Sequence, residues 1–174
     1  VSFVENITDI DDPLLERAAR DSQDWKELAA SQIDLFREDM TALSVLPPSA
    51  YRGVIESMAE IISLVEQMVA SGKTYELEGD IYLDLQQVDG AIQDLPLPLE
   101  RALAIFKERG GDPERVGKRH GLDPLLWKAR AGNDPYWIAP FGEGRPGWHI
   151  ECTAIAIKNL PETSPTSITL QAGG

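Results

Sequence analysis

Apolar residues recur at helical spacing in two long stretches of the chain. Behind Asp24, which precedes Glu27 at capping-box spacing, apolar positions continue every three to four residues to about Val45. Ser49 to Ser71 carries the strongest stripe, and Gly72 follows it as a helix stop. The members of this stripe are Val54, Met58, Ile61, Ile62, Val65, Met68 and Val69. We therefore expect helices over residues 24–45 and 49–71.

The rest of the pattern predicts shorter elements. Asp12 before Pro13 indicates a helix start, because Asp caps free N–H groups and Pro suits the first helical position. Residues 74–85 alternate and are interrupted by Gly79-Asp80, which predicts a small hairpin. The other expected elements are a strand over 1–6, a loop over 86–98, a helix over 99–109 stopped by two glycines, a short helix over 123–130, an ordered loop over 133–147, a helix over 148–160 and a strand over 167–171.

Composition narrows the class of protein. The 174 residues carry a formal net charge of −13, whereas nucleic-acid binders usually present a basic patch. The single cysteine cannot form an internal disulfide, and no apolar run approaches the roughly 20 residues of a membrane span. We therefore expect a cytoplasmic protein with no membrane attachment. The chain starts as if within a strand and ends on ITLQAGG, so both ends are expected to be cuts through a larger protein.

One candidate site is the stretch NITDIDD, Asn6 to Asp12. Three aspartates in four residues could hold a divalent cation, but such a cluster is more often a helix cap with solvated charge. Thr8 closes a predicted strand, where functional hydroxyls of open α/β sheets tend to lie.

A second candidate site is GRPGWHIEC, Gly144 to Cys152. In the expected helix, Trp148 and Cys152 would be four residues apart on one face. The common outcome of this pattern is burial in a core, since cysteine is among the most buried residue types. The alternative is a thiolate metal ligand beside an aromatic wall, although zinc requires three or four ligands. The chain has no Gly-x-x-x-x-Gly-Lys loop, and local motifs alone assign no activity.

The two stretches together resemble the cysteinyl-tRNA synthetase family and its close relatives. The string LDPLLWKARAGNDPYWIAPFGEGRPGWHIECTAIA is similar to that family throughout. LFREDMTALSVLPPSAY, GVIESMAEI and FKERGGDPERVGKR resemble the mycothiol cysteine ligase branch. RHGLD, Arg119 to Asp123, departs from the Arg-Asp-Pro-Leu-Asp that is common in the family.

The resemblance implies a fold and a division of the chain. The expected fold class is α/β, a fragment of a class I nucleotide-binding, Rossmann-like catalytic domain with a mostly helical connective insertion. Residues 1–48 would belong to the catalytic core, 49–120 would form the helical insertion with its small hairpin, and 121–174 would return to the core.

The resemblance also implies an activity for the larger protein. It would be an ATP-dependent ligase that joins L-cysteine to the amine of glucosaminyl-inositol through a cysteinyl-adenylate, in mycothiol biosynthesis. The alternative is a cysteinyl-tRNA synthetase, with tRNA as the acceptor. By matching positions, Thr8 would face the bound cysteine, Trp148 would form a wall of the cysteine pocket and Cys152 would be a zinc ligand.

The zinc ion would hold the thiolate of the substrate, and a soft thiolate binds zinc better than a serine hydroxyl does. The other family zinc ligands and the ATP-binding motifs have no match in this chain. The isolated chain is therefore expected to be inactive and to bind no zinc tightly, and the enzyme is expected to be a monomer. An alternative of another class is a non-catalytic helical interaction module, which would expose Val54, Met58, Ile62 and Val65.

Overall fold

The computed structural model describes residues 3–160. The chain divides into two compact units. Among the described residues, the first unit contains those up to Ala59 and those from Cys152, and the second contains Glu60–Glu151. The strand expected over 167–171 lies outside the described residues. The structure is mixed α/β, as the sequence predicted.

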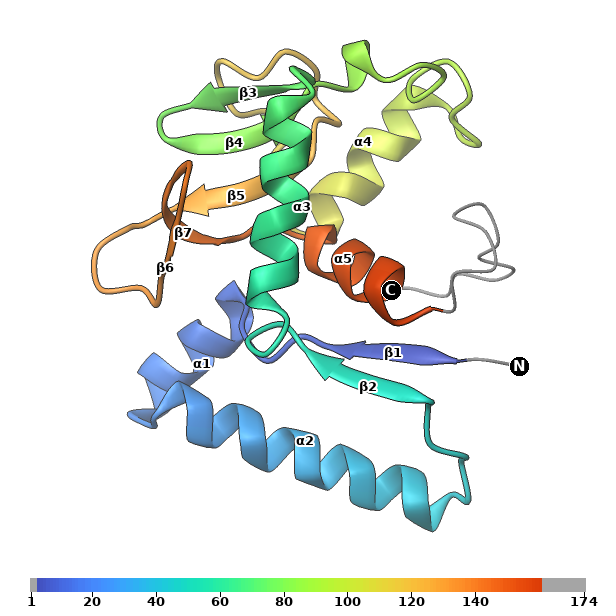
Figure 1. Ribbon diagram of the computed structural model, residues 1–174, viewed down its shortest axis with the longest axis vertical. Helices are drawn as coiled ribbons and strands as arrows, with labels where there is room; N and C mark the ends of the chain where they lie inside the picture. Colours follow the sequence, from blue (N-terminus) through green and yellow to red (C-terminus); the bar gives the residue numbers. More distant parts are fainter. Residues whose placement is uncertain (1–2, 161–174) are drawn as a thin grey trace. The chain divides into compact units, whose positions relative to one another are not determined.

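The first unit is built around two parallel strands. Strand β1 (Val4–Ile7) pairs in register with β2 (Ala50–Gly53), so that Ile7 lies opposite Gly53. Helices α1 (Asp12–Asp21) and α2 (Trp25–Ala42) connect the two strands and lie together on one side of them (Figure 1). A crossover of this kind is what two parallel strands require. The carboxyl ends of both strands therefore meet at one edge of the pair.

Side-chain caps fix where these two helices begin. Asp11, and not Asp12, caps α1, because its Oδ1 accepts the N–H of Leu14 at 2.7 Å. Pro13 remains inside the first turn, where its missing N–H costs nothing. Asp24 caps α2 by accepting the N–H groups of Lys26 and Glu27, as its spacing predicted. Helix α2 ends at Ala42, close to the expected end at Val45.

The single helix expected over 49–71 is wrong in its first half. Residues 50–53 form β2, a turn follows, and helix α3 covers only Met58–Ala70. Pairing with β1 overrides the helical stripe here, because the four residues bond their backbone groups across the pair. Val54, Met58 and Val65 are buried, so the exposed face that a helical interaction module would need is absent.

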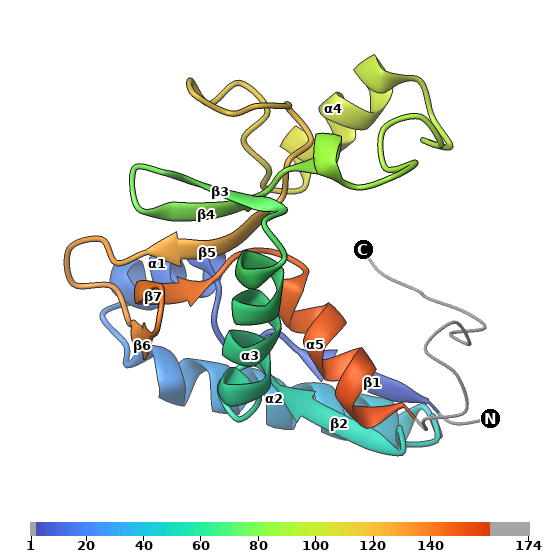
Figure 2. The ribbon, with the colours of Figure 1, turned by 45° about the horizontal axis from the view of Figure 1, so that its top comes forward.

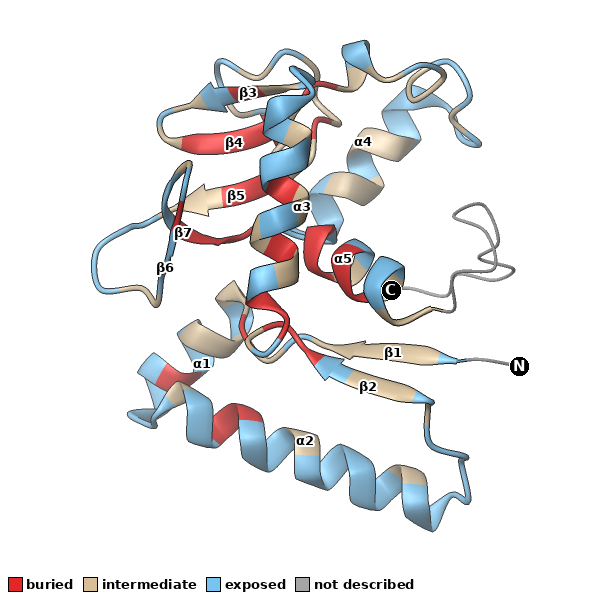
Figure 3. Cartoon of the chain, in the orientation of Figure 1, coloured by how far each residue is buried: buried red, intermediate tan, exposed pale blue. Residues whose placement is uncertain are grey.

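The second unit contains a five-stranded antiparallel sheet of order β3-β4-β5-β7-β6 (Figure 2). Its strands are β3 (Thr74–Leu77), β4 (Asp80–Leu83), β5 (Leu125–Ala129), β6 (Trp137–Ala139) and β7 (Gly142–Pro146). The predicted hairpin is confirmed as β3 and β4, with Glu78 and Gly79 both at positive φ in the turn. Figure 3 shows that buried residues concentrate on β4, β5 and β7.

Two expectations in this unit are wrong. Residues 125–129 form the central strand β5 and not a short helix, and residues 137–146 form β6 and β7 within the expected loop. The apolar run Leu125-Leu126-Trp127 fits a buried strand as well as a helix, and only its pairing with β4 and β7 decides between them. The predicted hairpin is thus part of a larger sheet that continues beyond residue 120, the expected end of the insertion. The division of the chain into core and insertion stays a prediction.

The remaining helical segments of the described residues are a 3-10 turn and two α-helices. A 3-10 turn (Leu85–Gln87) begins the expected loop, and α4 (Leu99–Glu108) ends before Gly110-Gly111 as predicted. Helix α5 (Ile150–Asn159) begins two residues later than expected. Within residues 3–160, no helix combines the length and the apolar character needed to cross a bilayer.

Candidate functional site

Thr8 lies directly after β1, at the edge where the two parallel strands end. It is exposed and lines a hollow of about 200 Å³ in the first unit. The other lining residues are Ile7, Asp9, Leu14, Ala29, Gln32, Ile33 and Phe36. The hollow is thus largely apolar, with the polar groups of Thr8, Asp9 and Gln32 at its surface. Ligands of open α/β sheets bind beyond the carboxyl ends of strands, which is where this hydroxyl lies.

Asp9 joins the end of β1 to the turn after β2. Its Oδ1 accepts the N–H of Val54 at 2.8 Å and the N–H of Ile55 at 3.1 Å. Gly53 is buried beside this carboxylate, and a Cβ at that position would lie 2.5 Å from Asp9 Oδ2. Burial raises the pKa of Asp9, and the two N–H groups partly oppose that rise.

Two of the three aspartates are therefore structural acceptors. Asp11 caps α1 and Asp9 holds the turn after β2, as described above. Among residues 3–160, no three His, Cys, Asp or Glu side chains are placed to hold a metal ion. The capping interpretation of NITDIDD is confirmed, and the divalent-cation alternative has no support in this part of the chain.

The Gly-Arg-Pro-Gly sequence, expected to lie in a loop, forms the end of strand β7 and packs closely against β5. A Cβ at Gly144 would collide with the carbonyl oxygen of Lys128, and one at Gly147 would collide with that of Leu125. Gly147 also donates its N–H to the carbonyl of Leu126 at 3.0 Å. Neither position has room for a side chain, so these glycines fix where the chain leaves the sheet, immediately before Trp148.

Trp148 does not lie on the helix that carries Cys152. Helix α5 begins at Ile150, and the backbone of His149, with a φ of 72°, is not helical. The expected one-turn stacking of Trp148 over Cys152 on a common helix face is therefore wrong. Instead, the indole of Trp148 covers Gly110, just beyond the end of α4. Trp148 keeps 38% of its surface exposed.

Cys152 is the third residue of α5 and is half-buried. Ala154 and Ile155 of the same helix are buried, as is the charged Glu151, so Cys152 lies beside the buried part of the helix. Thr8 and Cys152 belong to the first unit, whereas Trp148 belongs to the second. The roles of these three residues in catalysis remain predictions.

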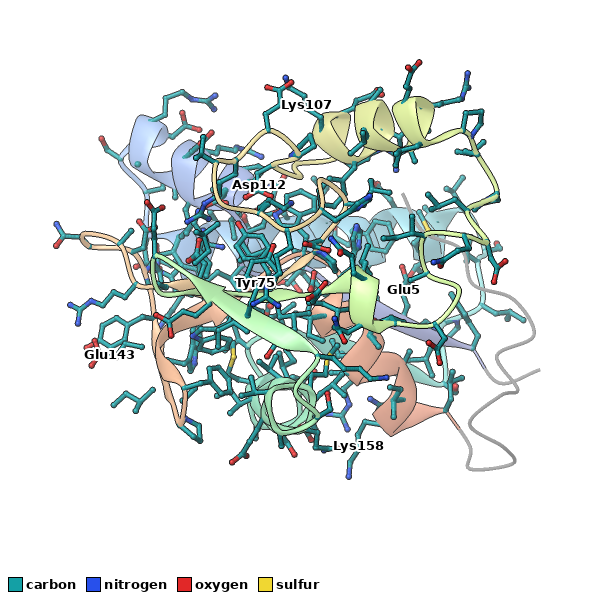
Figure 4. All side chains as sticks on the ribbon, turned by 90° about the horizontal axis from the view of Figure 1, so that it is seen from above. Glu5, Tyr75, Lys107, Asp112, Glu143 and Lys158 are labelled. Atoms are coloured by element: carbon teal, nitrogen blue, oxygen red, sulfur yellow. The ribbon has the colours of Figure 1, made fainter. Side chains whose placement is uncertain are left out.

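A charged network holds the loop after α4 against the sheet of the second unit. Asp112, labelled in Figure 4, accepts a hydrogen bond from the ammonium of Lys118 at 2.8 Å and one from the hydroxyl of Tyr82 at 2.5 Å. The Lys118 side chain is only 2% exposed, and its Nζ lies over the rings of Tyr82 and Phe106. Burial, and then the bond to Asp112, raise the pKa of Tyr82. The network thereby fixes the residues that follow Gly110-Gly111.

Asp123 organises the other end of the same loop. It is fully buried and accepts the hydroxyl of Tyr75 at 2.9 Å and the N–H groups of Leu85 and His120. Burial raises the pKa of Tyr75 to about 12, with a further contribution from Asp123. Asp123 is the aspartate of RHGLD, the stretch that departs from the common family sequence. Its hydrogen bonds to Tyr75, Leu85 and His120 hold the fold together.

Two of these features were missed in the sequence. Gly110-Gly111 was interpreted only as a helix stop, and nothing local indicated that Trp148 would cover it. No sequence motif indicated the network of Asp112 and Lys118 either. The only signal was an Asp and a Lys six residues apart in one loop, a spacing that can allow an ion pair across it.

Comparison with known proteins identifies close relatives. Over 92% of the chain, it is 52% identical to the L-cysteine:1D-myo-inositol 2-amino-2-deoxy-alpha-D-glucopyranoside ligase of Streptosporangium roseum. It is 53% identical over 92% of its length to the ligase of the same name from Thermobifida fusca, and 50% identical over its whole length to that of Corynebacterium diphtheriae.

The chain covers 39%, 39% and 42% of these three relatives, or about two fifths of their length. Residues 1–174 match the family described as tRNA synthetases class I (C) catalytic domain. The match extends over the parallel pair before Thr8, the sheet before Trp148 and the helix that carries Cys152. The chain therefore belongs to the class I (C) tRNA synthetase catalytic-domain family.

Proposed function

We propose that the whole protein is an ATP-dependent cysteine ligase of mycothiol biosynthesis. The carboxylate of L-cysteine would attack the α-phosphorus of ATP, forming cysteinyl-adenylate and releasing pyrophosphate. The amine of glucosaminyl-inositol would then attack the activated carbonyl, forming an amide and releasing AMP. The observation that carries this proposal is about 50% identity to ligases of that name over 92% to 100% of the chain.

The arrangement of the first unit supports a nucleotide-binding core. Two parallel strands joined by a helical crossover are the repeating unit of doubly wound sheets, in which ligands lie at the carboxyl ends of strands. Thr8 occupies that position and lines the hollow described above. The finer assignment, a Rossmann-like core with an insertion, is proposed on this basis. The sheet of the second unit spans the boundary expected at residue 120, so the insertion is proposed to follow Glu60–Glu151 instead.

The residue roles belong to the same proposal. Thr8 would face the bound cysteine with its exposed hydroxyl, and Trp148 would present an apolar wall with the exposed part of its indole. Bound zinc would supply Lewis-acid binding of the substrate thiolate. Within residues 3–160, no three candidate ligands for it lie together. Cys152 would contribute one ligand to a site completed by residues elsewhere in the whole protein.

The alternative acceptor is tRNA, and the family match accommodates it. The net charge of −13 favours a small acceptor over a polyanion. Cytoplasmic location and a monomeric state remain predictions within this proposal.

The test is a pair of assays on the whole protein with L-cysteine and ATP. We expect an amide product with glucosaminyl-inositol and no cysteinylation of tRNA. Cysteinylation of tRNA with no use of glucosaminyl-inositol would replace this proposal with the synthetase alternative, and the absence of cysteine-dependent pyrophosphate exchange would contradict both.

A further inference from the structure

Gly110 provides the surface on which the Trp148 indole rests. A Cβ at Gly110 would lie 3.2 Å from Cζ2, 3.3 Å from Cε2 and 3.5 Å from Cη2 of Trp148. The first two distances are tighter than ordinary van der Waals contact, and all three involve the six-membered ring of the indole. The φ of Gly110 is +90°, a conformation that side chains with a Cβ rarely adopt. The Trp148 ring therefore packs as closely as a residue without a side chain permits.

The backbone at Gly110 is held from both sides. Gly110 donates its N–H to the carbonyl of Lys107, and Gly111 donates its N–H to that of Phe106 at 2.8 Å. Asp112, two residues further on, is bound by Lys118 and Tyr82. A methyl group added at Gly110 cannot be accommodated by withdrawal of this backbone without breaking these bonds.

The indole is the part of the contact that can move. The main chain of Gly147, next to Trp148, lies against the Leu125 carbonyl and is bonded to Leu126. The Trp148 side chain, in contrast, is 38% exposed, so rotation toward solvent is open to it. A side chain at Gly110 would therefore displace the indole in preference to either backbone.

We propose that Gly110 is a positioning residue that acts through Trp148 and sets the affinity of the enzyme for cysteine. The inference rests on the proposed function, in which Trp148 forms a wall of the cysteine pocket. Displacement of that wall would weaken binding of cysteine before any chemical step. It would therefore raise KM for cysteine more than it lowers kcat.

The chain offers a matched control in Gly72. Gly72 also follows the end of a helix, has a φ of +72° and donates its N–H to a carbonyl three residues before it. Nothing lies within 4 Å of a Cβ built there. Gly72→Ala therefore imposes the same kind of backbone strain as Gly110→Ala but displaces no neighbour.

The experiment measures cysteine-dependent ATP–pyrophosphate exchange with the whole protein. We expect Gly110→Ala to raise KM for cysteine about tenfold with kcat changed by less than about twofold, because a misplaced contact costs affinity at this scale. Gly72→Ala should leave both constants near those of the wild type. Gly110→Asn is the second variant, since Asn tolerates positive φ but still carries a Cβ. It should reproduce the KM effect even where Gly110→Ala folds poorly.

A double-mutant cycle with Trp148→Phe separates this role from a general structural one. Phe lacks the outer, fused ring of the indole, which is the ring that contacts Gly110. Gly110→Ala should therefore add no further increase in KM in that background. An equal increase in both backgrounds, or equal effects of Gly110→Ala and Gly72→Ala, would overturn the inference while leaving the proposed function intact. A wild-type protein without cysteine-dependent exchange would overturn the proposed function and the inference together.

Discussion

Asp9 Oδ1 lies 2.8 Å from the backbone nitrogen of Val54, a bond that joins the end of β1 to the turn after β2. The same oxygen accepts the N–H of Ile55, so one carboxylate oxygen fixes two residues that are far away in sequence. Thr8 precedes Asp9, and the bond therefore also holds the segment that presents the proposed cysteine-facing hydroxyl.

Two replacements of Asp9 should separate the contribution of its hydrogen-bond acceptor to stability from that of its charge. Asp9→Ala removes the carboxylate acceptor of both N–H groups, although the Val54 N–H keeps the Ile7 carbonyl at 3.2 Å, and it should lower the free energy of unfolding by about 1–3 kcal/mol. Asp9→Asn keeps an oxygen that can accept both bonds and should cost clearly less. Urea unfolding of the two variants measures the difference. Equal losses would show that the bonds to Val54 and Ile55 contribute little.

The raised pKa of Asp9 also predicts a pH dependence. Burial lifts this pKa above its ordinary value of 3.8, so the folded chain binds the proton more tightly than the unfolded chain does. The contribution of Asp9 to stability is then present at low pH and is lost as pH rises through the folded pKa. The stability of the wild type relative to Asp9→Asn should fall across this window and be constant above it. Urea midpoints of both proteins over a pH series check this, and a rise with pH would contradict it.

The buried ammonium of Lys118 should stabilise the second unit more than an exposed one does. Lys118→Met keeps the aliphatic stem but leaves Asp112 without its closest cation, and we expect a loss of about 1.5–3 kcal/mol, since a hydrogen bond to a charged group contributes at this scale. Lys107→Met is the control, because Lys107 and Glu114 are 58% and 77% exposed, and it should cost less than about 1 kcal/mol. Thermal unfolding of both variants provides the comparison, and equal costs would contradict a structural role for the Lys118 bond.

Local signals explain which elements were predictable from the sequence. The Asp24 cap, the glycines after α4 and the hairpin of β3 and β4 each depend on neighbours in the chain, and each is confirmed. Strands β2, β5 and β7 depend on partners far away in sequence. The run Leu125-Leu126-Trp127 and the segment Ala50–Gly53 gave helical patterns that only these pairings override.

The same distinction applies to the candidate site. Thr8 was correctly placed after a strand because the strand pattern ends locally at Ile7. The stacking of Trp148 over Cys152 on one helix face was predicted wrongly, because the positive φ of His149 leaves Trp148 outside the helix. The contact between Gly110 and Trp148 arises from the packing of the second unit, and no periodicity could have indicated it.

Ionisation of Tyr75 should weaken the fold at alkaline pH. Its pKa is raised to about 12 from 10.0, chiefly by burial, so the folded chain keeps a proton that the unfolded chain loses. The resulting stability is fully present below the unfolded pKa and is lost as pH rises through the folded pKa. Tyr75→Phe removes this group while Asp123 keeps the N–H groups of Leu85 and His120. The variant should therefore lose less stability between pH 10 and 12 than the wild type, as measured by urea unfolding.

Zinc binding should require more than this chain. Structural and catalytic zinc sites use about three or four protein ligands, and residues 3–160 place no three candidate ligands together. The isolated chain should therefore retain less than stoichiometric zinc after gel filtration, by metal analysis. In the whole protein, we expect stoichiometric zinc that is lost in Cys152→Ser, because the hydroxyl that replaces the thiolate is a poor ligand. Tight stoichiometric zinc on the isolated chain would contradict the need for outside ligands, and full zinc retention by Cys152→Ser would remove Cys152 from the proposed site.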